Sequence, residues 1–332
     1  MTRRVHDQAV VVTGASNGIG RATSRLFAEA GATVFAAARD ADALESLAGE
    51  AGGRVVPVPT DVTDPAAVRA LAETAVQHAG RVDTWVNAAA THEYAWFEDT
   101  TPEEFAEVLT TNVLGQVHGA YAAVPVLAAN DTGGVLIGVS SVEGVRAVPL
   151  QAPYVTSKWA LRGFYDTLRM EMALRHPDVK VTTILPASID TPIFEHARTK
   201  LERLPKPPPP LYAPEVVARA ILHASEHPQR ELPVGGSAAQ FMVGQRFAPS
   251  LMDWLLSRRF AAVKAQQTDL PNPPSDNLGG PVPGGSERGA VQQSVSSVKE
   301  RSLFTELVWQ RPAVKRGLIG AALAAIGWAV AR

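Results

Sequence analysis

The chain contains no cysteine among its 332 residues. This absence excludes disulfide bonds, thiolate catalysis and cysteine-ligated metal sites, and it is compatible with a reducing compartment. An excess of charge of one sign is also missing, because 31 Lys and Arg face 33 Asp and Glu, which gives a formal net charge of −2. This balance gives no electrostatic reason to expect nucleic acid as a partner.

The N-terminus lacks a long apolar run. Residues 1–7 hold two Arg and one Asp and lead directly into the apolar residues 9–12, which are too few for the apolar region of a signal peptide. We therefore expect a cytoplasmic protein. No spaced cluster of His, Asp and Glu accompanies His92 or His196, so we expect these two side chains to line a pocket or face solvent, and we expect no metal site.

Up to about residue 234, short apolar runs alternate with helical patterns, which is typical of βαβ units. Helices are expected to begin after Asp64, Thr101 and Ala213, each of which precedes a proline, and to end at Gly31 and Gly80. The expected strands are 9–12, 33–37, 55–58, 84–86, 135–139, 179–185 and 231–234. The pattern predicts an α/β fold with a doubly wound, mostly parallel seven-stranded sheet and helices on both faces.

The composition changes beyond this region. Residues 205–210 include four consecutive prolines, which predict an extended loop over the site. We expect one domain over 1–265, and a flexible linker over 266–300, which is rich in Pro, Gly, Ser and Gln. The tail 301–332 holds fifteen uncharged residues, 317–331, before the terminal Arg332. They predict an apolar helix that attaches to the cytoplasmic face of a membrane or docks on protein.

A glycine-rich turn follows the first expected strand, with the sequence Thr-Gly-Ala-Ser-Asn-Gly-Ile-Gly from residue 13 to residue 20. Between a strand and a helix, such a turn lets the backbone approach a pyrophosphate, and the helix N-terminus supplies unpaired N–H groups and a positive dipole end. The turn therefore predicts a dinucleotide site. Its contacts are expected from Gly14, Ser16, Asn17, Gly18, Ile19 and Gly20.

The end of the second expected strand indicates which dinucleotide binds. An acidic residue there would accept hydrogen bonds from the ribose 2′-OH of NAD, but this chain has Ala38 at that place. The guanidinium of the following Arg39 suits the 2′-phosphate of NADP. We expect NADP(H) to be preferred over NAD(H); the alternative is a solvated Arg39 beside Asp40.

A phenol and an ammonium lie four residues apart at Tyr154 and Lys158, so they share one helix face with Cβ atoms about 6 Å apart. A free phenol titrates near pKa 10, and a nearby cation favours the phenolate. Ser141 follows the expected strand 135–139, where the carboxyl end of a parallel strand faces ligands. Together these groups predict proton transfer to or from a carbonyl or alcohol oxygen.

These motifs, in this order, resemble the short-chain dehydrogenase/reductase family over about residues 8–235. The resemblance rests on the Thr-Gly-x-x-x-Gly-x-Gly turn, Asn87, Asn112, Ser141, Tyr154 and Lys158. It implies a Rossmann-type fold and hydride transfer between a nicotinamide and the carbon of a ketone or secondary alcohol. It implies Tyr154 as general acid in reduction and base in oxidation, and Ser141 as the orienting and oxyanion group. Lys158 becomes a pKa modulator and ribose ligand, and Asn112 the anchor of a proton relay.

The resemblance implies further cofactor contacts and an oligomer. The additional contacts are Asp61, Val62, Asn87, Tyr154, Lys158, Pro186, Ile189 and Thr191. Two places depart from the family pattern: Ala88, Ala89 and Ala90 follow Asn87 where relatives have Asn-Ala-Gly, and Ala187 stands where relatives have Gly. A homodimer or homotetramer is implied.

Three segments, 92–97, 143–151 and 189–210, are expected to wall the substrate site, and they are mostly apolar. This favours a small hydrophobic carbonyl or alcohol substrate. The alternative is a cofactor-binding regulatory protein without turnover, which the presence of both Tyr154 and Lys158 disfavours. The spacing of the glycine turn disfavours a sugar-nucleotide epimerase or dehydratase.

Overall fold

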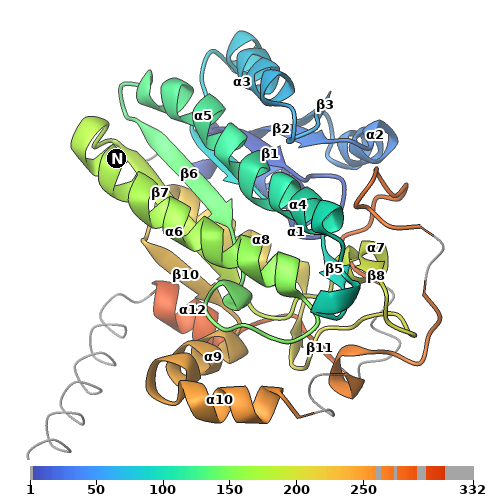
Figure 1. Cartoon of the computed structure of the whole chain (residues 1–332). Coiled ribbons are helices and arrows are strands. Elements are labelled where there is room, and N and C mark those ends of the chain that lie inside the picture. The colour runs from blue at the N-terminus through green and yellow to red at the C-terminus, as the bar shows by residue number, and fades with distance from the viewer. Residues whose placement is uncertain (1–2, 259–262, 273–274, 290–296, 311–332) are drawn as a thin grey trace, which may run out of the picture.

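A seven-stranded parallel sheet forms the centre of this computed structural model, in the order β10-β7-β6-β4-β1-β2-β3 (Figure 1). The structure describes residues 3–258, 263–272, 275–289 and 297–310. The strands are β1 Ala9–Thr13, β2 Thr33–Ala38, β3 Val55–Pro59, β4 Thr84–Asn87, β6 Gly134–Val139, β7 Val179–Pro186 and β10 Glu231–Val234. The expected α/β doubly wound fold is confirmed, and each expected strand agrees to within one residue at either end.

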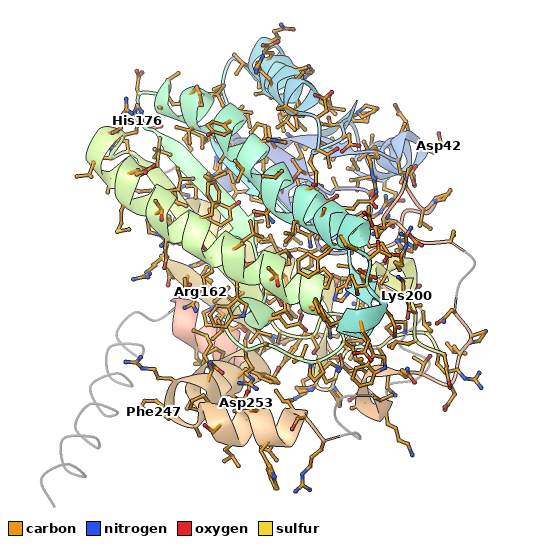
Figure 2. The ribbon with its side chains drawn as sticks, viewed as in Figure 1. Asp42, Arg162, His176, Lys200, Phe247 and Asp253 are labelled. Atoms are coloured by element: carbon orange, nitrogen blue, oxygen red, sulfur yellow. The ribbon has the colours of Figure 1, made fainter. Side chains whose placement is uncertain are left out.

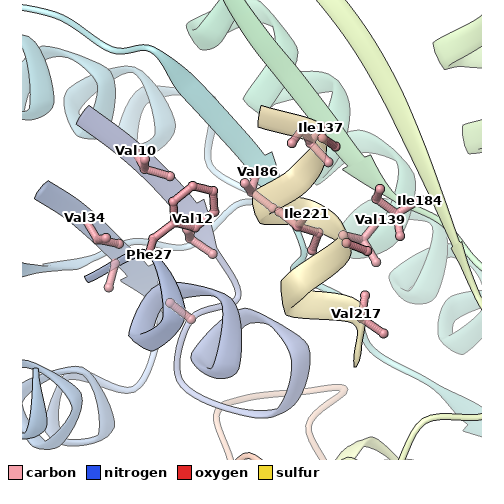
Figure 3. Packing of buried hydrophobic residues seen from close by; sticks show 14 of the residues in the cluster. Val10, Val12, Phe27, Val34, Val86, Ile137, Val139, Ile184, Val217 and Ile221 are labelled. Atoms are coloured by element: carbon pink, nitrogen blue, oxygen red, sulfur yellow. The ribbon is translucent and has the colours of Figure 1, made fainter. Parts of the chain in front are cut away.

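Helices cover both faces of the sheet (Figure 1). On one face lie α1 Gly18–Glu29, α2 Ala41–Glu50 and α8 Pro214–Glu226; on the other lie α3 Pro65–Ala79, α5 Gly115–Ala128 and α6 Ala152–Arg175. Figure 3 shows Val10, Val12 and Phe27 in the first of the two apolar cores. Because the strands are buried on both sides, they form continuous apolar runs in the sequence.

The helix ends follow the expected cap signals. The carboxylate of Asp64 accepts a hydrogen bond from the backbone of Ala66 at the start of α3. Thr101 and Glu104 cap each other's backbone N–H groups at the start of α4 Pro102–Leu109, which satisfies two otherwise unpaired donors. Gly80 ends α3 in the left-handed conformation with φ 74°, as a C-terminal glycine commonly does.

Shorter elements complete the fold. Two small parallel pairs join β5 Glu93–Tyr94 to β8 Arg198–Thr199 and β9 Leu211–Tyr212 to β11 Val298–Lys299. The remaining helices include α7 Ile193–His196, α9 Gly236–Phe247, α10 Pro249–Leu256 and α12 Leu303–Gln310. The last three form one group beside β10, and Figure 2 labels Phe247 and Asp253 there.

The described part of the expected linker 266–300 does not stand apart from the domain. Within it, β11 pairs with β9, and the N–H of Gly18 donates to the carbonyl of Ser286 at 2.8 Å. Polar contacts hold this segment together with the burial of Leu278, which is 2% exposed, and composition does not reveal such contacts. The expected apolar helix 317–331 lies outside the described residues. None of the helices described in the structure is long and apolar enough to cross a membrane.

Candidate active site

A groove, termed here the main groove, opens at the carboxyl ends of the central strands, where ligands bind in doubly wound sheets. It is lined by every residue expected in the site except Asn87 and Asn112. The expected residues that line it are Gly14, Ser16, Asn17, Gly18, Ile19, Gly20, Arg39, Asp61, Val62, Ser141, Tyr154, Lys158, Pro186, Ile189 and Thr191. The structure thus brings the residues expected to bind the cofactor and the residues expected to transfer the proton to one groove.

The glycine turn has the shape that a dinucleotide requires. Gly14 has φ +72°, and a Cβ there would lie 2.6 Å from the backbone of Ala89. A Cβ at Gly20 would lie 2.1 Å from the carbonyl oxygen of Gly14. Only glycine fits at these two positions. The tight turn presents the N-terminus of α1 to the main groove, and such a donor set fits a pyrophosphate.

Arg39 and Asp61 line the main groove on the side of β2 and β3. Arg39 donates through Nη2 to the backbone carbonyls of Asn277 and Gly280, at 2.9 and 3.1 Å. It is therefore held in place rather than free in solvent. The carboxylate of Asp61 accepts hydrogen bonds from the backbone and the hydroxyl of Thr63 at 2.9 and 2.8 Å, which fixes the turn that presents it.

Ser141, Tyr154 and Lys158 meet where β6 ends and α6 begins. The ammonium of Lys158 lies 5.1 Å from the centroid of the Tyr154 ring and donates to the carbonyl of Val139 at 3.4 Å. The hydroxyl of Ser141 accepts from the backbone N–H of Glu143 at 3.1 Å. This places an alcohol, a phenol and an ammonium beside one another on the main groove.

Burial dominates the proton affinities of this cluster. It raises the pKa of the Tyr154 phenol above its ordinary value of 10; the nearby Glu143 carboxylate raises it further, and the hydrogen bond with Ser141 lowers it. Burial also lowers the pKa of Lys158 to about 8, against the opposing effect of Glu143. The raised pKa leaves the phenol protonated near neutral pH, and the expected effect of the Lys158 charge on the phenolate stays a prediction.

His92 supports the phenol, a role that sequence reasoning missed. Its ring stacks on Tyr154 with centroids 3.9 Å apart and on Tyr94 with centroids 4.3 Å apart. Burial lowers the pKa of His92 to about 3, so the ring is neutral and its Nε2 donates to Gln151 at 2.8 Å. The only sequence signal was the position of His92 in an expected pocket wall.

A second cavity, termed the side pocket, adjoins the main groove; Ser141, Tyr154 and Phe194 line both. Its apolar wall residues are Val142, Val148, Ala187, Ile193, Phe194, Pro207, Pro208 and Phe241. Its polar wall residues include Arg146, Ser188 and Glu143. One carboxylate oxygen of Glu143 is buried and has no hydrogen-bond partner among the described residues. Burial raises the pKa of Glu143 to about 7, while Lys158 opposes the rise. The expected apolar site therefore contains one acid that sequence reasoning did not single out.

Asn112 lies behind the groove, in a π-helical turn, Thr110–Leu114, and it is fully buried. Its amide accepts from the N–H of Thr91 at 2.8 Å and donates to the carbonyl of Thr91 and to Ser157, both at 3.0 Å. Ser157 in turn donates to the carbonyl of Tyr154 at 2.6 Å. Asn112 thus connects the turn to α6, and π-helical turns are frequent at functional sites.

Asn87 is the other expected residue that the structure keeps out of the main groove. Its side chain accepts from the indole of Trp85 at 2.9 Å. It donates to the carbonyl of Gln116 and to the hydroxyl of Tyr165, both at 3.1 Å. Asn87 therefore joins β4 to α5 and α6.

Known proteins share this architecture. A family model described as short chain dehydrogenase matches residues 8–202. The uncharacterized oxidoreductase YxnA of Bacillus subtilis is 37% identical over 339 residues, which cover 99% of this chain and 92% of that protein. The 3-oxoacyl-[acyl-carrier-protein] reductase FabG of Thermotoga maritima is 34% identical over 66% of this chain and 90% of its own.

Solved structures of short-chain dehydrogenases and reductases have a similar fold. A short-chain dehydrogenase from Streptomyces avermitilis superposes with a TM-score of 0.63 at 28% identity, covering 74% of this chain and 96% of its own. A 3-ketoacyl-(acyl-carrier-protein) reductase from Brucella melitensis, complexed with NADH, superposes with a TM-score of 0.59 at 26% identity. The match covers 68% of this chain and 95% of that protein. The chain therefore belongs to the short-chain dehydrogenase/reductase family, the nicotinamide-dependent oxidoreductases of carbonyl and alcohol groups.

Proposed function

We propose that the protein is an NADP(H)-preferring enzyme that reduces hydrophobic ketones or oxidises the corresponding secondary alcohols, with Tyr154 as the proton donor or acceptor. The observation that carries this proposal is the shared lining of the main groove by the glycine turn, Arg39, Ser141, Tyr154 and Lys158. A bound nicotinamide would supply or accept the hydride. Tyr154 of the chain itself would donate or accept the proton.

The electrostatics suit proton donation during reduction. Because the Tyr154 phenol stays protonated near neutral pH, it can donate to a carbonyl oxygen as that oxygen gains negative charge. The hydroxyl of Ser141 borders the same space and can donate a hydrogen bond to that oxygen. In oxidation, the ammonium of Lys158 is charged below its pKa of about 8 and stabilises the phenolate that must accept the proton.

Arg39 supports the preference for NADP(H). Its Nη2 is occupied by two backbone carbonyls, and a guanidinium carries three further N–H donors on Nη1 and Nε. These donors suit a 2′-phosphate. Ala38 adds no carboxylate that would repel that phosphate.

The side pocket supports a hydrophobic substrate. It joins the main groove beside Ser141 and Tyr154, and Phe194, Pro207 and Phe241 provide apolar surface. Apolar surface of this kind binds the body of an apolar molecule, and the polar groups beside it orient the one reacting oxygen.

The proposal extends to assembly and location. Homo-oligomers are usual in the family, so we propose a homodimer or homotetramer. We also propose a cytoplasmic enzyme whose segment 317–331, outside the described residues, attaches it to the membrane surface. The alternative for that segment is docking on protein.

A panel of ketones and secondary alcohols, assayed with the four nicotinamide cofactors, tests the reaction class. Tyr154→Phe should lower turnover at least about a hundredfold and leave the Kd of NADPH nearly unchanged, because it removes only the proton donor. Retained turnover in Tyr154→Phe would contradict the mechanism. Tight NADPH binding without turnover of any compound would favour the regulatory alternative.

A further inference from the structure

Residues 275–289, termed the strap, cross the open side of the main groove. Within the strap, Asn277, Pro281 and Val282 line the groove together with residues of the domain. In Figure 1 the strap is the orange segment that passes beside α2. It follows the region matched by the family model, residues 8–202.

The first attachment of the strap lies near the substrate side. Arg198 donates two hydrogen bonds to the carboxylate of Asp276, at 3.0 and 3.1 Å. The N–H of Asn277 donates to the carbonyl of His196 at 2.8 Å, and its side-chain oxygen accepts from Thr91 at 2.6 Å. This end is therefore tied to β8, to α7 and to the loop after β4.

The second attachment lies at the adenosine end of the groove. The carbonyls of Asn277 and Gly280 both accept from Arg39. Further along, the N–H of Gly284 donates to the carboxylate of Asp40 at 3.3 Å. The strap thus contacts the residues that follow β2 and positions the guanidinium proposed to bind the 2′-phosphate.

The third attachment lies at the glycine turn. The backbone N–H groups of Gly285 and Ser286 donate to the side-chain oxygen of Asn17 at 3.2 and 3.0 Å. The N–H of Gly18 donates to the carbonyl of Ser286 at 2.8 Å. Beyond it, Arg25 forms a two-pronged ion pair with Glu287 at 2.6 and 2.9 Å, a geometry that strengthens charge-assisted hydrogen bonds.

We propose that the strap is part of the cofactor site and closes over the bound dinucleotide, so that it must detach before the cofactor leaves. The strap is fastened on both sides of the groove, and residues of the strap and of the domain line the same space beneath it. At the glycine turn it contacts Asn17 and Gly18, which line the groove together with Ser16 and Ile19. The inference rests on nicotinamide binding within the proposed function and not on the NADP preference.

The test removes the two carboxylates that fasten the strap, Asp276 and Glu287, neither of which lines the groove. In the double variant Asp276→Ala/Glu287→Ala, NADPH should leave about tenfold faster and its Kd should rise accordingly, because two charge-assisted pairs no longer oppose opening. Stopped-flow fluorescence of NADPH measures the release rate without any substrate.

A matched control exists in Glu231→Ala. It removes another two-pronged pair, Arg162 with Glu231, at 2.6 and 3.2 Å. The side chain of Glu231 is 14% exposed and that of Glu287 is 16% exposed, so the two changes are comparable. Figure 2 labels Arg162 on α6. This variant should keep the release rate of the unmodified chain, and melting temperatures show whether each variant folds.

An unchanged release rate in a folded double variant would overturn the proposal, and so would tighter binding, which would mean that the strap competes with the cofactor.

Hydrogen exchange on the unmodified chain provides a second measurement. NADP⁺ should slow exchange of the strap amides, and faster exchange would also overturn the proposal. If NADPH and NADH bind equally tightly, only the proposed preference for NADP(H) is contradicted. If neither cofactor binds, the proposed function and the role of the strap are both contradicted.

Discussion

At the residue scale, Glu143 couples the ionisations of Tyr154 and Lys158. A carboxylate disfavours a neighbouring phenolate and favours a neighbouring ammonium, so its charge raises the pKa of both groups. The pKa of Glu143 itself is raised to about 7 by burial, so this influence appears as the pH rises through neutrality. We therefore expect the site to respond to pH near neutrality.

Replacing Glu143 should shift the pH dependence of catalysis. In Glu143→Gln the charge is absent above pH 7, so the pKa values of Tyr154 and Lys158 fall. Reduction needs the protonated phenol, and its decline at high pH should set in at lower pH; oxidation needs the phenolate and should begin at lower pH. Profiles of kcat/KM against pH in both directions measure the shift. The control is Glu103→Gln, an exposed acid of α4, and a shift towards higher pH would contradict the argument.

Arg39 carries the prediction on cofactor choice. Arg39→Asp removes a cation and adds a charge that repels a 2′-phosphate, so the preference for NADPH over NADH should be erased or reversed. The ratio of kcat/KM for the two cofactors measures the effect. Arg54→Asp makes the same charge change at an exposed residue that contacts Gly31 and should leave the ratio unchanged. Equal efficiency of both cofactors in the unmodified enzyme would refute the prediction.

Sequence reasoning predicted which groups lie together better than it predicted where individual side chains point. The spacing of Tyr154 and Lys158 fixes their common helix face whatever surrounds them, and Ser141 follows from the end of a strand. Asn87 also stands at a strand end, yet its side chain turns to Gln116 and Tyr165. These partners come from distant helices, and local pattern carries no information about them. Glu143 was missed for the same reason.

At the element scale, the strands were predictable because a parallel strand buried on both faces must be apolar throughout. Helix starts such as Thr101 with Glu104 were predictable because their caps are local in sequence. The strap was not, since its attachments are hydrogen bonds and ion pairs to residues as distant as Asn17 and Arg198. A segment poor in apolar residues was expected to be a flexible linker, and its polar contacts with the domain could not be read from its composition.

The π-helical turn gives a prediction about stability and positioning. Asn112→Ala leaves the buried N–H and carbonyl of Thr91 without partners, which should lower the free energy of unfolding by about 2 kcal/mol or more. Turnover should fall as well, because the link through Ser157 to the backbone of Tyr154 is lost. Urea unfolding and kcat measure the two effects. Thr110→Ala in the same turn removes only a bond to the carbonyl of Ala106, and equal losses in both variants would contradict this role.

At the scale of the whole molecule, the chain beyond the family match is integrated with the active site. The FabG relative of Thermotoga maritima covers 66% of this chain, whereas YxnA of Bacillus subtilis covers 99%. The added length contributes β11 beside β9, the strap over the main groove, and Gln266, which accepts from Gln151 at 2.6 Å. Since Gln151 in turn accepts from His92, the extension reaches both the cofactor side and the substrate side of the site.

The last prediction concerns residues 317–331, which are uncharged and follow Lys315 and Arg316. As a helix this segment would be about 22 Å long, shorter than a hydrocarbon core of about 30 Å, so shallow attachment is favoured over a full span. The basic pair suits anionic headgroups and Trp328 suits the interface. The full chain should therefore sediment with anionic lipid vesicles, and a chain ending at Arg311 should not. Both should reduce a water-soluble ketone equally fast, because the strap and the main groove precede residue 311. If both chains stay in the supernatant at low and high salt, the segment docks on protein instead.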